Sequence, residues 1–318
     1  MAENNEDVKK ENEDVKKTKL DEYFQNICND NPLEKLSKFI CPSLVGDEWK
    51  KIRQAGLLTL VTGSDNTTRM RLHMLLDGKP GTGKSIWGLW WRENLQGILI
   101  NAELTSKTGL VGDARGSKIT AGLLADYTGN IVICDELDKM SLPDTNGLLQ
   151  SMEEGQYTIV KGKHRETFKA EVRIIGNTNK MGKLQKPLLD RFDFIYTCKT
   201  ASRDDRVENV GRIVDTFMGN DDIEYGKIIR GYIGWLGNYS PKILPKNRDK
   251  VVGILKKYIR EVKDYEVEKV SYRSLELSCL RIAWAMAKLK KTNIGTQEMI
   301  DAIIFKNDIL RRIYGVKL

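Results

Sequence analysis

The residue types and spacing of one short segment point first to phosphate chemistry. Residues 78–85 read GKPGTGKS and match the pattern G-x-x-x-x-G-K-[ST] directly after the apolar run 74–76. Glycines let backbone N–H groups approach a polyphosphate, and the N-terminus of a following helix adds partial positive charge. The pattern predicts a nucleotide site in which Lys84 reaches the β- and γ-phosphates and Ser85 ligates Mg²⁺. The residues expected to hold the nucleotide are Gly78, Pro80, Gly81, Thr82, Gly83, Lys84 and Ser85.

Two adjacent acids follow a second apolar run. Residues 131–136 read IVICDE, which is typical of a buried strand that ends in carboxylates. We expect Asp135 to hold Mg²⁺ directly or through water, and Glu136 to act as general base for the attacking water. The alternative is a solvated strand end, which the phosphate-binding pattern upstream makes less favoured.

Two more polar residues lie beside predicted strands. Asn177 follows the run 172–176, where it can orient a water between the acids and the γ-phosphate; alternatively it is a turn asparagine that tolerates left-handed geometry. Arg191 lies in the segment LLDRFD and is either a surface arginine or a finger that neutralises charge on a neighbour's γ-phosphate.

Several segments are similar in sequence, and in their order along the chain, to segments of the AAA+ motor domain of the minichromosome maintenance (MCM) replicative helicases. The resemblance covers about residues 37–313 and is more specific than the AAA+ class alone. It implies an α/β fold, a P-loop AAA+ parallel sheet flanked by helices with a C-terminal helical lid. The segments that carry it are CPSLVGDE at 41–48, GKPGTGKS at 78–85, AGLL at 121–124, DELDKM at 135–140, PLLDRFDFI at 187–195 and YRSLE at 272–276.

The resemblance also implies a role for each matching residue. Lys84 and Ser85 bind phosphate and magnesium, so ATP and Mg²⁺ are the expected cofactors, while the two acids at the strand end are metal ligand and base. Asn177 resembles the sensor-1 asparagine. Arg191 resembles an arginine finger that acts in trans, and Arg273 is similar to the sensor-2 arginine that reaches a neighbouring subunit's nucleotide. Activity would then require a homo-oligomeric ring, expected to be a hexamer.

Residues 157–165 read as a β-hairpin, with a β-branched run, a glycine turn and a second strand. The hairpin is similar to the family's pre-sensor-1 hairpin, whose tip lysine contacts DNA in the central channel. Lys161 matches that lysine, and Lys163 and Arg165 add basic groups, so these three are the candidate DNA-binding residues. A solvated basic turn is the alternative. The segment 109–119 stands where the family has its helix-2 insert.

The chain departs from the family in two respects. Gly83 stands where MCM proteins usually carry alanine, which leaves the P-loop pattern competent. We also expect this chain to have neither the family's N-terminal DNA-binding region, with its oligonucleotide-binding fold and zinc ribbon, nor its C-terminal winged helix. These departures concern how the chain binds DNA and do not affect the expected ATPase chemistry.

Composition limits the classes of partner. The 318 residues carry a formal net charge of +8, which favours a polyanionic partner such as single-stranded or forked DNA. The five cysteines are scattered without a C-x-x-C pair and only two histidines are present, so we expect no zinc site. No signal peptide or long apolar run is evident, which predicts a soluble, cytoplasmic protein with no membrane contact.

We expect three regions along the chain. Residues 1–20, with a charged seven-residue repeat, form a disordered tail; 21–202 form the AAA+ nucleotide-binding domain; 203–318 form the helical lid. Trp87, Trp90 and Trp91 are interpreted as packing residues of the helix after the P-loop. Two apolar stripes are predicted to be core of the lid: Val207, Val210, Ile213, Val214 and Phe217 form the first, and Ile254, Leu255, Tyr258, Ile259 and Val262 the second.

The sequence thus predicts an ATP-dependent, ring-forming DNA helicase or translocase acting in DNA replication, possessing ATPase activity and loaded by an initiator or loader protein. One alternative is an AAA+ remodeller or loader that acts on a protein partner. Another is a non-catalytic DNA-binding subunit that uses ATP only to assemble.

Overall fold

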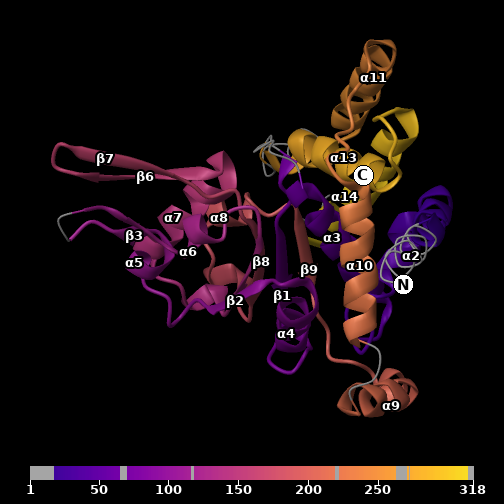
Figure 1. The fold of residues 1–318 in the computed structure, drawn as a ribbon, viewed down its shortest axis with the longest axis horizontal. Helices are drawn as coiled ribbons and strands as arrows, with labels where there is room; N and C mark the ends of the chain where they lie inside the picture. Colours follow the sequence, from indigo (N-terminus) through magenta and orange to yellow (C-terminus); the bar gives the residue numbers. More distant parts are fainter. Residues whose placement is uncertain are drawn as a thin grey trace, which may run out of the picture.

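A computed structural model describes residues 18–64, 70–115, 118–218, 222–262, 271 and 273–313. Its centre is a parallel sheet of five strands in the order β2-β5-β8-β1-β9 (Figure 1). Strand β1 lies between β8 and β9, and its Met74 pairs with Ile175 of β8 and with Phe194 of β9. The strands are β1 (Met74–Asp77), β2 (Ile98–Asn101), β5 (Ile131–Asp135), β8 (Arg173–Thr178) and β9 (Phe194–Thr197). The predicted parallel α/β sheet is confirmed.

The sheet is buried on both faces, which is why its strands are continuous apolar runs rather than alternating ones. Successive side chains of a strand point to opposite faces, so neighbours in sequence join different cores. In β1, Met74 and Leu76 belong to one hydrophobic cluster, and Leu75 belongs to the other. The first cluster extends into the C-terminal helices, and the second lies beneath α5 (Lys107–Leu110), α6 (Leu123–Asp126) and α7 (Leu142–Glu154).

Helix α4 (Lys84–Leu95), which follows the P-loop, packs through its tryptophans. Trp87 and Trp91 are fully buried and Trp90 is almost so. The rings of Trp87 and Trp91 lie against Gly56 of α3 (Asp47–Val61), where a Cβ atom would come within 2.9 Å of both. The packing interpretation of these tryptophans is confirmed.

The C-terminal helices pack on the side of the sheet opposite the two hairpins (Figure 1). Helix α13 contacts α3, and α14 contacts the edge strand β9. The second predicted apolar stripe belongs to the core here, since Tyr258 and Val262 are buried and the other members pack against them. The helices are α10 (Asp222–Leu236), α11 (Pro245–Glu261), α13 (Ser278–Leu289) and α14 (Thr296–Ile313), with one π-helical turn at Arg273–Leu277.

The first predicted stripe is not core, and the prediction for it was wrong. It lies on α9 (Arg203–Phe217), which Figure 1 shows apart from α10, α13 and α14. Val207 is 68% exposed and Val214 48%. The side chain of Phe217 lies outside those described. Helical periodicity shows that one face of a helix is apolar, but it does not determine what covers that face.

Residues 1–17 of the predicted tail lie outside the described residues, and residues 18–20 begin a helix that continues to 29. Among the described residues, no helix combines the length and the apolar character needed to cross a bilayer.

Candidate functional site

The predicted nucleotide-binding and catalytic residues, with the exception of two arginines, gather at the carboxyl edge of the sheet. The P-loop leaves β1 after Asp77, and Asp135 ends β5 directly opposite Asn101 at the end of β2. Asn177 of β8 pairs with Leu76 of β1. Parallel strands present all their carboxyl ends at one edge, so residues far apart in sequence meet there.

The P-loop takes its shape from glycines in the left-handed region. Gly81 and Gly83 have φ values of 81° and 93°. At Gly83 a Cβ atom would also lie 2.7 Å from a methyl carbon of Leu44. The positive φ at Gly83 favours glycine, and a Cβ atom there would require the end of the Leu44 side chain to shift.

Lys84 begins α4 and turns back over the loop. Its Nζ donates to the carbonyl oxygens of Gly78 at 2.5 Å and Lys79 at 3.0 Å, and to Thr82 Oγ1 at 3.3 Å. Burial lowers the pKa of Lys84, while nearby carboxylates, including Asp135, oppose that shift. The ammonium group is thus already held among the loop atoms that would surround a phosphate.

The oxygen ligands needed for Mg²⁺ are present. Ser85 is exposed in the first turn of α4, and Asp135 is half-buried at the end of β5. One oxygen of Asp135 accepts a hydrogen bond from the Glu136 N–H at 3.0 Å, which leaves the carboxylate capacity for further ligation. A hydroxyl and a carboxylate are ligands that Mg²⁺ prefers, so these residues fit the ion together with a triphosphate.

Glu136 is held by two partners that the sequence analysis did not identify. Lys139 Nζ lies 2.9 Å from Glu136 Oε1, and Asn101 Nδ2 donates to Oε2 at 3.1 Å. Hydrogen bonding to Lys139 is the main cause of the lowered pKa of Glu136, and Asn101 adds to it. Lys139 in turn binds Glu103 at 2.7 Å. The candidate base is therefore tied to the segment that follows β2.

Asn177 is completely buried beside the P-loop helix. Its Nδ2 donates to the carbonyl oxygen of Lys84 at 3.2 Å, whereas its Oδ1 is buried without a hydrogen-bond partner. A buried acceptor without a partner is unfavourable and calls for an explanation such as an additional ligand or water. This position suits a residue that orients a water molecule in the site.

The two arginines lie together at the opposite edge of the sheet. Glu153 at the end of α7 binds Arg191 Nε at 2.7 Å and Arg273 Nη1 at 3.4 Å, and Arg273 Nη2 donates to the carbonyl oxygen of Arg191 at 3.0 Å. Arg191 precedes β9, whose first residue is in register with Met74 at the start of β1. The four residues of β1 correspond to about 13 Å of strand between this edge and the P-loop.

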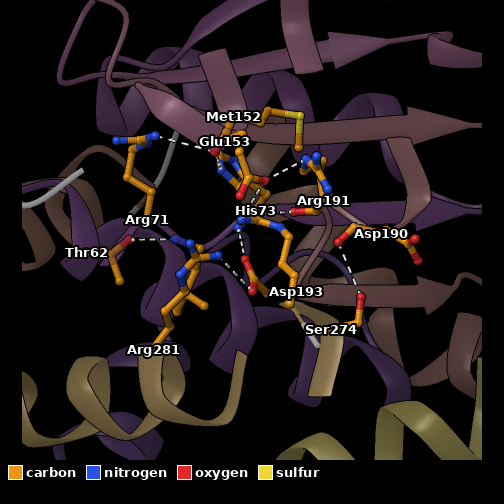
Figure 2. A network of polar contacts seen from close by, with 12 residues as sticks. Thr62, Arg71, His73, Met152, Glu153, Asp190, Arg191, Asp193, Ser274 and Arg281 are labelled. Atoms are coloured by element: carbon orange, nitrogen blue, oxygen red, sulfur yellow. Dashed lines mark hydrogen bonds and ion pairs between the residues drawn. The ribbon is translucent and has the colours of Figure 1, made fainter. Parts of the chain in front are cut away.

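A buried polar network supports these arginines, and Figure 2 shows it around His73 and Asp193. Asp193 accepts a hydrogen bond from the His73 N–H at 3.0 Å and lies 3.6 Å from Arg281 Nη1. Burial and the surrounding cations keep the pKa of His73 well below its ordinary value. Burial also lowers the pKa of Arg273 to about 10, so the guanidinium stays charged at neutral pH.

Two hairpins project from the side of the sheet away from the C-terminal helices (Figure 1). One comprises β6 (Gln156–Lys161) and β7 (His164–Lys169), and the other β3 (Gly112–Asp113) and β4 (Thr120–Ala121). The three candidate DNA-binding residues are exposed at or near the tip of the first.

The register of this hairpin places its basic residues on different faces. Lys161 pairs with His164, and Arg165 pairs with Val160, so Lys161 and Arg165 point to opposite faces. Lys161 Nζ donates to the carbonyl oxygen of Arg115 in the second hairpin at 3.2 Å. Lys163 lies in the turn itself. The tip lysine is thus directed toward the hairpin of β3 and β4.

A cavity of about 660 Å³ lies beside the P-loop. It is formed where residues 43–49, the P-loop and α9 approach one another. The lining residues are Ser43, Leu44, Val45, Trp49, Gly81, Thr82, Gly83, Ile86, Lys199, Ala201, Arg206, Asn209, Val210 and Ile213. The cavity is continuous with the phosphate-binding loop and has mainly apolar walls.

Sequence reasoning missed Asn101, Lys139, Glu153 and Asn209. Asn101 ends a short apolar run, and a polar residue at a strand end is a signal that can be read in advance. Lys139 stands three residues after Glu136, a spacing that brings side chains together in a helical turn. Glu153 and Asn209 offered no comparable signal, because their partners Arg191 and Ser43 lie far from them in the chain.

Comparison with known proteins is consistent with this geometry. Residues 21–217 match the MCM family model, described as the MCM P-loop domain. A probable DNA helicase MCM9 of Oryza sativa subsp. indica is 27% identical over 312 residues, 84% of this chain. A DNA replication licensing factor MCM3 of Entamoeba histolytica is 29% identical over 55% of the chain. A Holliday junction branch migration complex subunit RuvB of Synechocystis is 33% identical over 39% of the chain.

Each of these relatives is longer than the part of it that aligns with this chain. The alignments cover 44% of the rice protein, 33% of the Entamoeba protein and 34% of the Synechocystis protein. The chain therefore spans less than half the length of each of them.

Proposed function

Since the chain belongs to the MCM family, we propose that it is the motor domain of an ATP-driven, ring-forming DNA helicase or translocase that acts in DNA replication. The observation that carries the proposal is the division of the catalytic residues between two edges of one sheet. Lys84, Asp135 and Glu136 lie at the carboxyl edge, whereas Arg191 and Arg273 are bound to Glu153 at the amino edge.

This division supports a site shared between neighbouring copies. A strand length of about 13 Å separates the two groups within one copy, and both arginines are already engaged with Glu153. A heterologous contact that repeats head to tail would bring the amino edge of one copy to the carboxyl edge of the next, and such contacts form a ring when the rotation between copies closes. We infer a homo-oligomeric ring and propose a hexamer.

Each residue has a defined part in the proposed reaction. Lys84 binds the β- and γ-phosphates, and Glu136 takes a proton from the attacking water, which Asn177 orients. Arg191 of the adjoining copy stabilises charge on the γ-phosphate, an effect worth on the order of 10³–10⁵ in rate for such fingers. Ser85 and Asp135 would hold Mg²⁺, which neutralises charge on the phosphate oxygens when bound.

DNA contact is assigned to the hairpin of β6 and β7. Its tip carries Lys161, Lys163 and Arg165, all exposed, and it projects away from the nucleotide-binding edge (Figure 1). Basic side chains at such a tip neutralise backbone phosphates, so binding should weaken steeply as salt increases. ATP turnover that displaces these tips around a ring would pull a strand through the channel.

A mixing experiment tests the shared site. Lys84→Ala and Arg191→Ala proteins should each lack ATP turnover, because each removes one half of every site in a homogeneous ring. A mixture of the two should recover a measurable part of the wild-type rate, since some interfaces then combine an intact P-loop with an intact arginine.

Single-stranded DNA should be present in the assay and should stimulate turnover by the wild-type protein. The matched control mixes Lys84→Ala with Lys84→Ala,Arg191→Ala, where every intact arginine faces a defective P-loop and no recovery is expected. Absence of recovery in the test mixture, with mixed rings demonstrated by native mass spectrometry, would refute the shared site.

A further inference from the structure

Helix α11 exposes a basic face that belongs neither to the nucleotide site nor to the hairpin of β6 and β7. Its 17 residues include six basic and two acidic side chains, whereas the whole chain has a net charge of +8. Half of the excess positive charge of the protein is therefore concentrated in this one helix. Figure 1 shows α11 at the top of the view, where it projects beyond α13 and away from the sheet.

The charge lies on the face of α11 that is opposite its packed face. Val251, Tyr258 and Val262 are buried and hold the helix against the core. The opposite face is a straight row of exposed residues at spacings of four, three, four and three positions, which is the period of an α-helix. The residues of this α11 row are Lys246, Lys250, Gly253, Lys257 and Arg260. From first to last they extend over about 21 Å of helix.

Most cations of the α11 row are not neutralised within the protein. In the described part of the chain, the ion pairs of α11 are Arg248 with Asp249 at 3.0 Å and Lys257 with Glu261 at 3.8 Å, all with exposed side chains. The other three cations of the row have no carboxylate partner among the described residues. The row is therefore available to an anionic partner from outside the chain.

The arrangement of these residues opposes the stability of the helix itself. Lys246 lies in the first turn, which has no acidic residue, although the helix dipole favours acids there. Lys246 and Lys250 are like charges four residues apart, a spacing at which they repel each other. Gly253 lies in mid-helix, where glycine is unfavourable, and a Cβ atom there would meet nothing within 4 Å. Residues that break local rules without a packing reason are expected at functional surfaces.

The chemistry of the α11 row indicates the class of partner. A straight row of cations fits a polyanion with regularly spaced charges, such as the phosphate backbone of a nucleic acid. The missing side chain at Gly253 lets a phosphate approach the helix backbone closely. Proteins that bind single strands stack the bases on aromatic side chains, but the row contains none and Tyr258 of α11 is buried. Contacts with a duplex backbone need only cations and hydrogen-bond donors.

We propose that the α11 row binds the phosphate backbone of duplex DNA, as a second DNA contact in addition to the hairpin of β6 and β7. This inference rests on the proposed function for the choice of DNA as the polyanion. The length of the row corresponds to about six base pairs, since phosphates repeat every ~3.4 Å along the axis on each strand. The C-terminal helices would then hold duplex while the hairpins hold the strand that is moved.

The test is binding of a fluorescently labelled blunt duplex, measured by anisotropy without nucleotide over a series of salt concentrations. Lys246→Gln,Lys250→Gln removes two cations of the row. Each lost phosphate contact should reduce the steepness of log K against log salt by about one, so this variant should be less steep by about two. Its affinity at about 0.1 M salt should fall by about tenfold or more. The midpoint of urea unfolding should stay or rise, because repulsion in the first turns is removed.

A matched control removes the same charge elsewhere. Lys38→Gln,Lys227→Gln replaces two exposed lysines outside α11, which lie 3.8 Å from Glu34 and 3.1 Å from Glu224. It should keep the duplex affinity to within about twofold, because charges away from the contact are screened by salt.

A third variant tests the close approach at Gly253 without changing charge. Gly253→Leu fills the open position in the row and should weaken duplex binding severalfold. The fold should be at least as stable as wild type, since leucine is a better helix former than glycine. Unchanged duplex affinity in this variant would overturn the close approach.

The possible outcomes separate this proposal from its alternatives. Unchanged duplex binding by Lys246→Gln,Lys250→Gln, or an equal loss in the lysine control, would overturn it. An equal loss for a single strand of the same sequence would show that α11 does not distinguish a duplex, which also overturns it. Loss of poly-glutamate binding with duplex binding intact would assign the row to an acidic protein instead. Wild-type protein that binds duplex through α11 but hydrolyses no ATP would overturn the proposed function and leave the duplex contact in place.

Discussion

Glu136 shows how a candidate catalytic residue can be held before its substrate arrives. Its carboxylate is bound by Lys139 and Asn101, and these contacts lower its pKa. A carboxylate that is hydrogen-bonded in this way is a weaker base. Its oxygens contact Lys139 and Asn101 instead of a water molecule. Release of Lys139 would raise the basicity of Glu136.

A pH profile can test this coupling. In Lys139→Met the pKa of Glu136 should rise toward its ordinary value, because the hydrogen bond that stabilises the charged form is lost. The base must be deprotonated to act, so the acid limb of the kcat profile at saturating ATP should shift to higher pH. Lys163→Met removes a lysine of the hairpin turn and should leave this limb in place. An unchanged limb in Lys139→Met would show that Glu136 is not the titrating base or that Lys139 does not control it.

At the scale of elements, the hairpin of β6 and β7 has two faces with different surroundings. Its first residues join the core, since Tyr157 is buried and accepts a hydrogen bond from the Gly122 N–H at 3.3 Å. Toward the tip, the face that carries Lys161 meets the second hairpin, whereas Arg165 is on the other face. The two hairpins are thus linked at base and tip.

We predict that Lys161→Ala abolishes unwinding of a forked DNA while most ATP turnover remains, because the substitution removes the tip contact and not the nucleotide site. Strand displacement and phosphate release measured on the same preparations check this. Lys169→Ala, at the base of the same hairpin, should retain unwinding because its ammonium binds Glu171 and lies away from the tip. Intact unwinding by Lys161→Ala would instead favour a motor that acts on a protein partner.

At the scale of the whole molecule, Asp193 joins the sheet to the C-terminal helices. It is 1% exposed, and its carboxylate contacts His73, which directly precedes β1, and Arg281 of α13. Its carbonyl oxygen accepts from Lys306 of α14 at 2.8 Å. One residue thereby binds elements that lie far apart in the sequence, within the core that extends from the sheet to these helices.

Replacement of this charge should destabilise the entire fold. Asp193→Asn retains an acceptor for the His73 N–H but removes the negative charge that lies 3.6 Å from the buried Arg281. Breaking a buried pair from one side typically costs about 3–5 kcal/mol of unfolding free energy. Urea unfolding should show a lower midpoint with an unchanged m value. Asp204→Asn on the exposed surface of α9 should stay within about 0.5 kcal/mol of wild type, and an equal loss there would contradict the assignment.

The sequence by itself determined the sheet, the P-loop and the acidic strand end. These features are encoded locally: eight residues specify the phosphate loop, and continuous apolar runs specify buried parallel strands. Parallel strands then place their carboxyl ends together, so the meeting of Lys84, Asp135 and Asn177 could be predicted without coordinates.

Only the tertiary structure decided how the remaining side chains are paired. Glu136 with Asn101, Arg273 with Glu153 and Asn209 with Ser43 are contacts between residues far apart in the chain. Such contacts depend on how separate helices and strands dock, and no local pattern encodes that docking. For the same reason the apolar face of α9 could be recognised from its periodicity, whereas its position beside the P-loop cavity and outside the core could not.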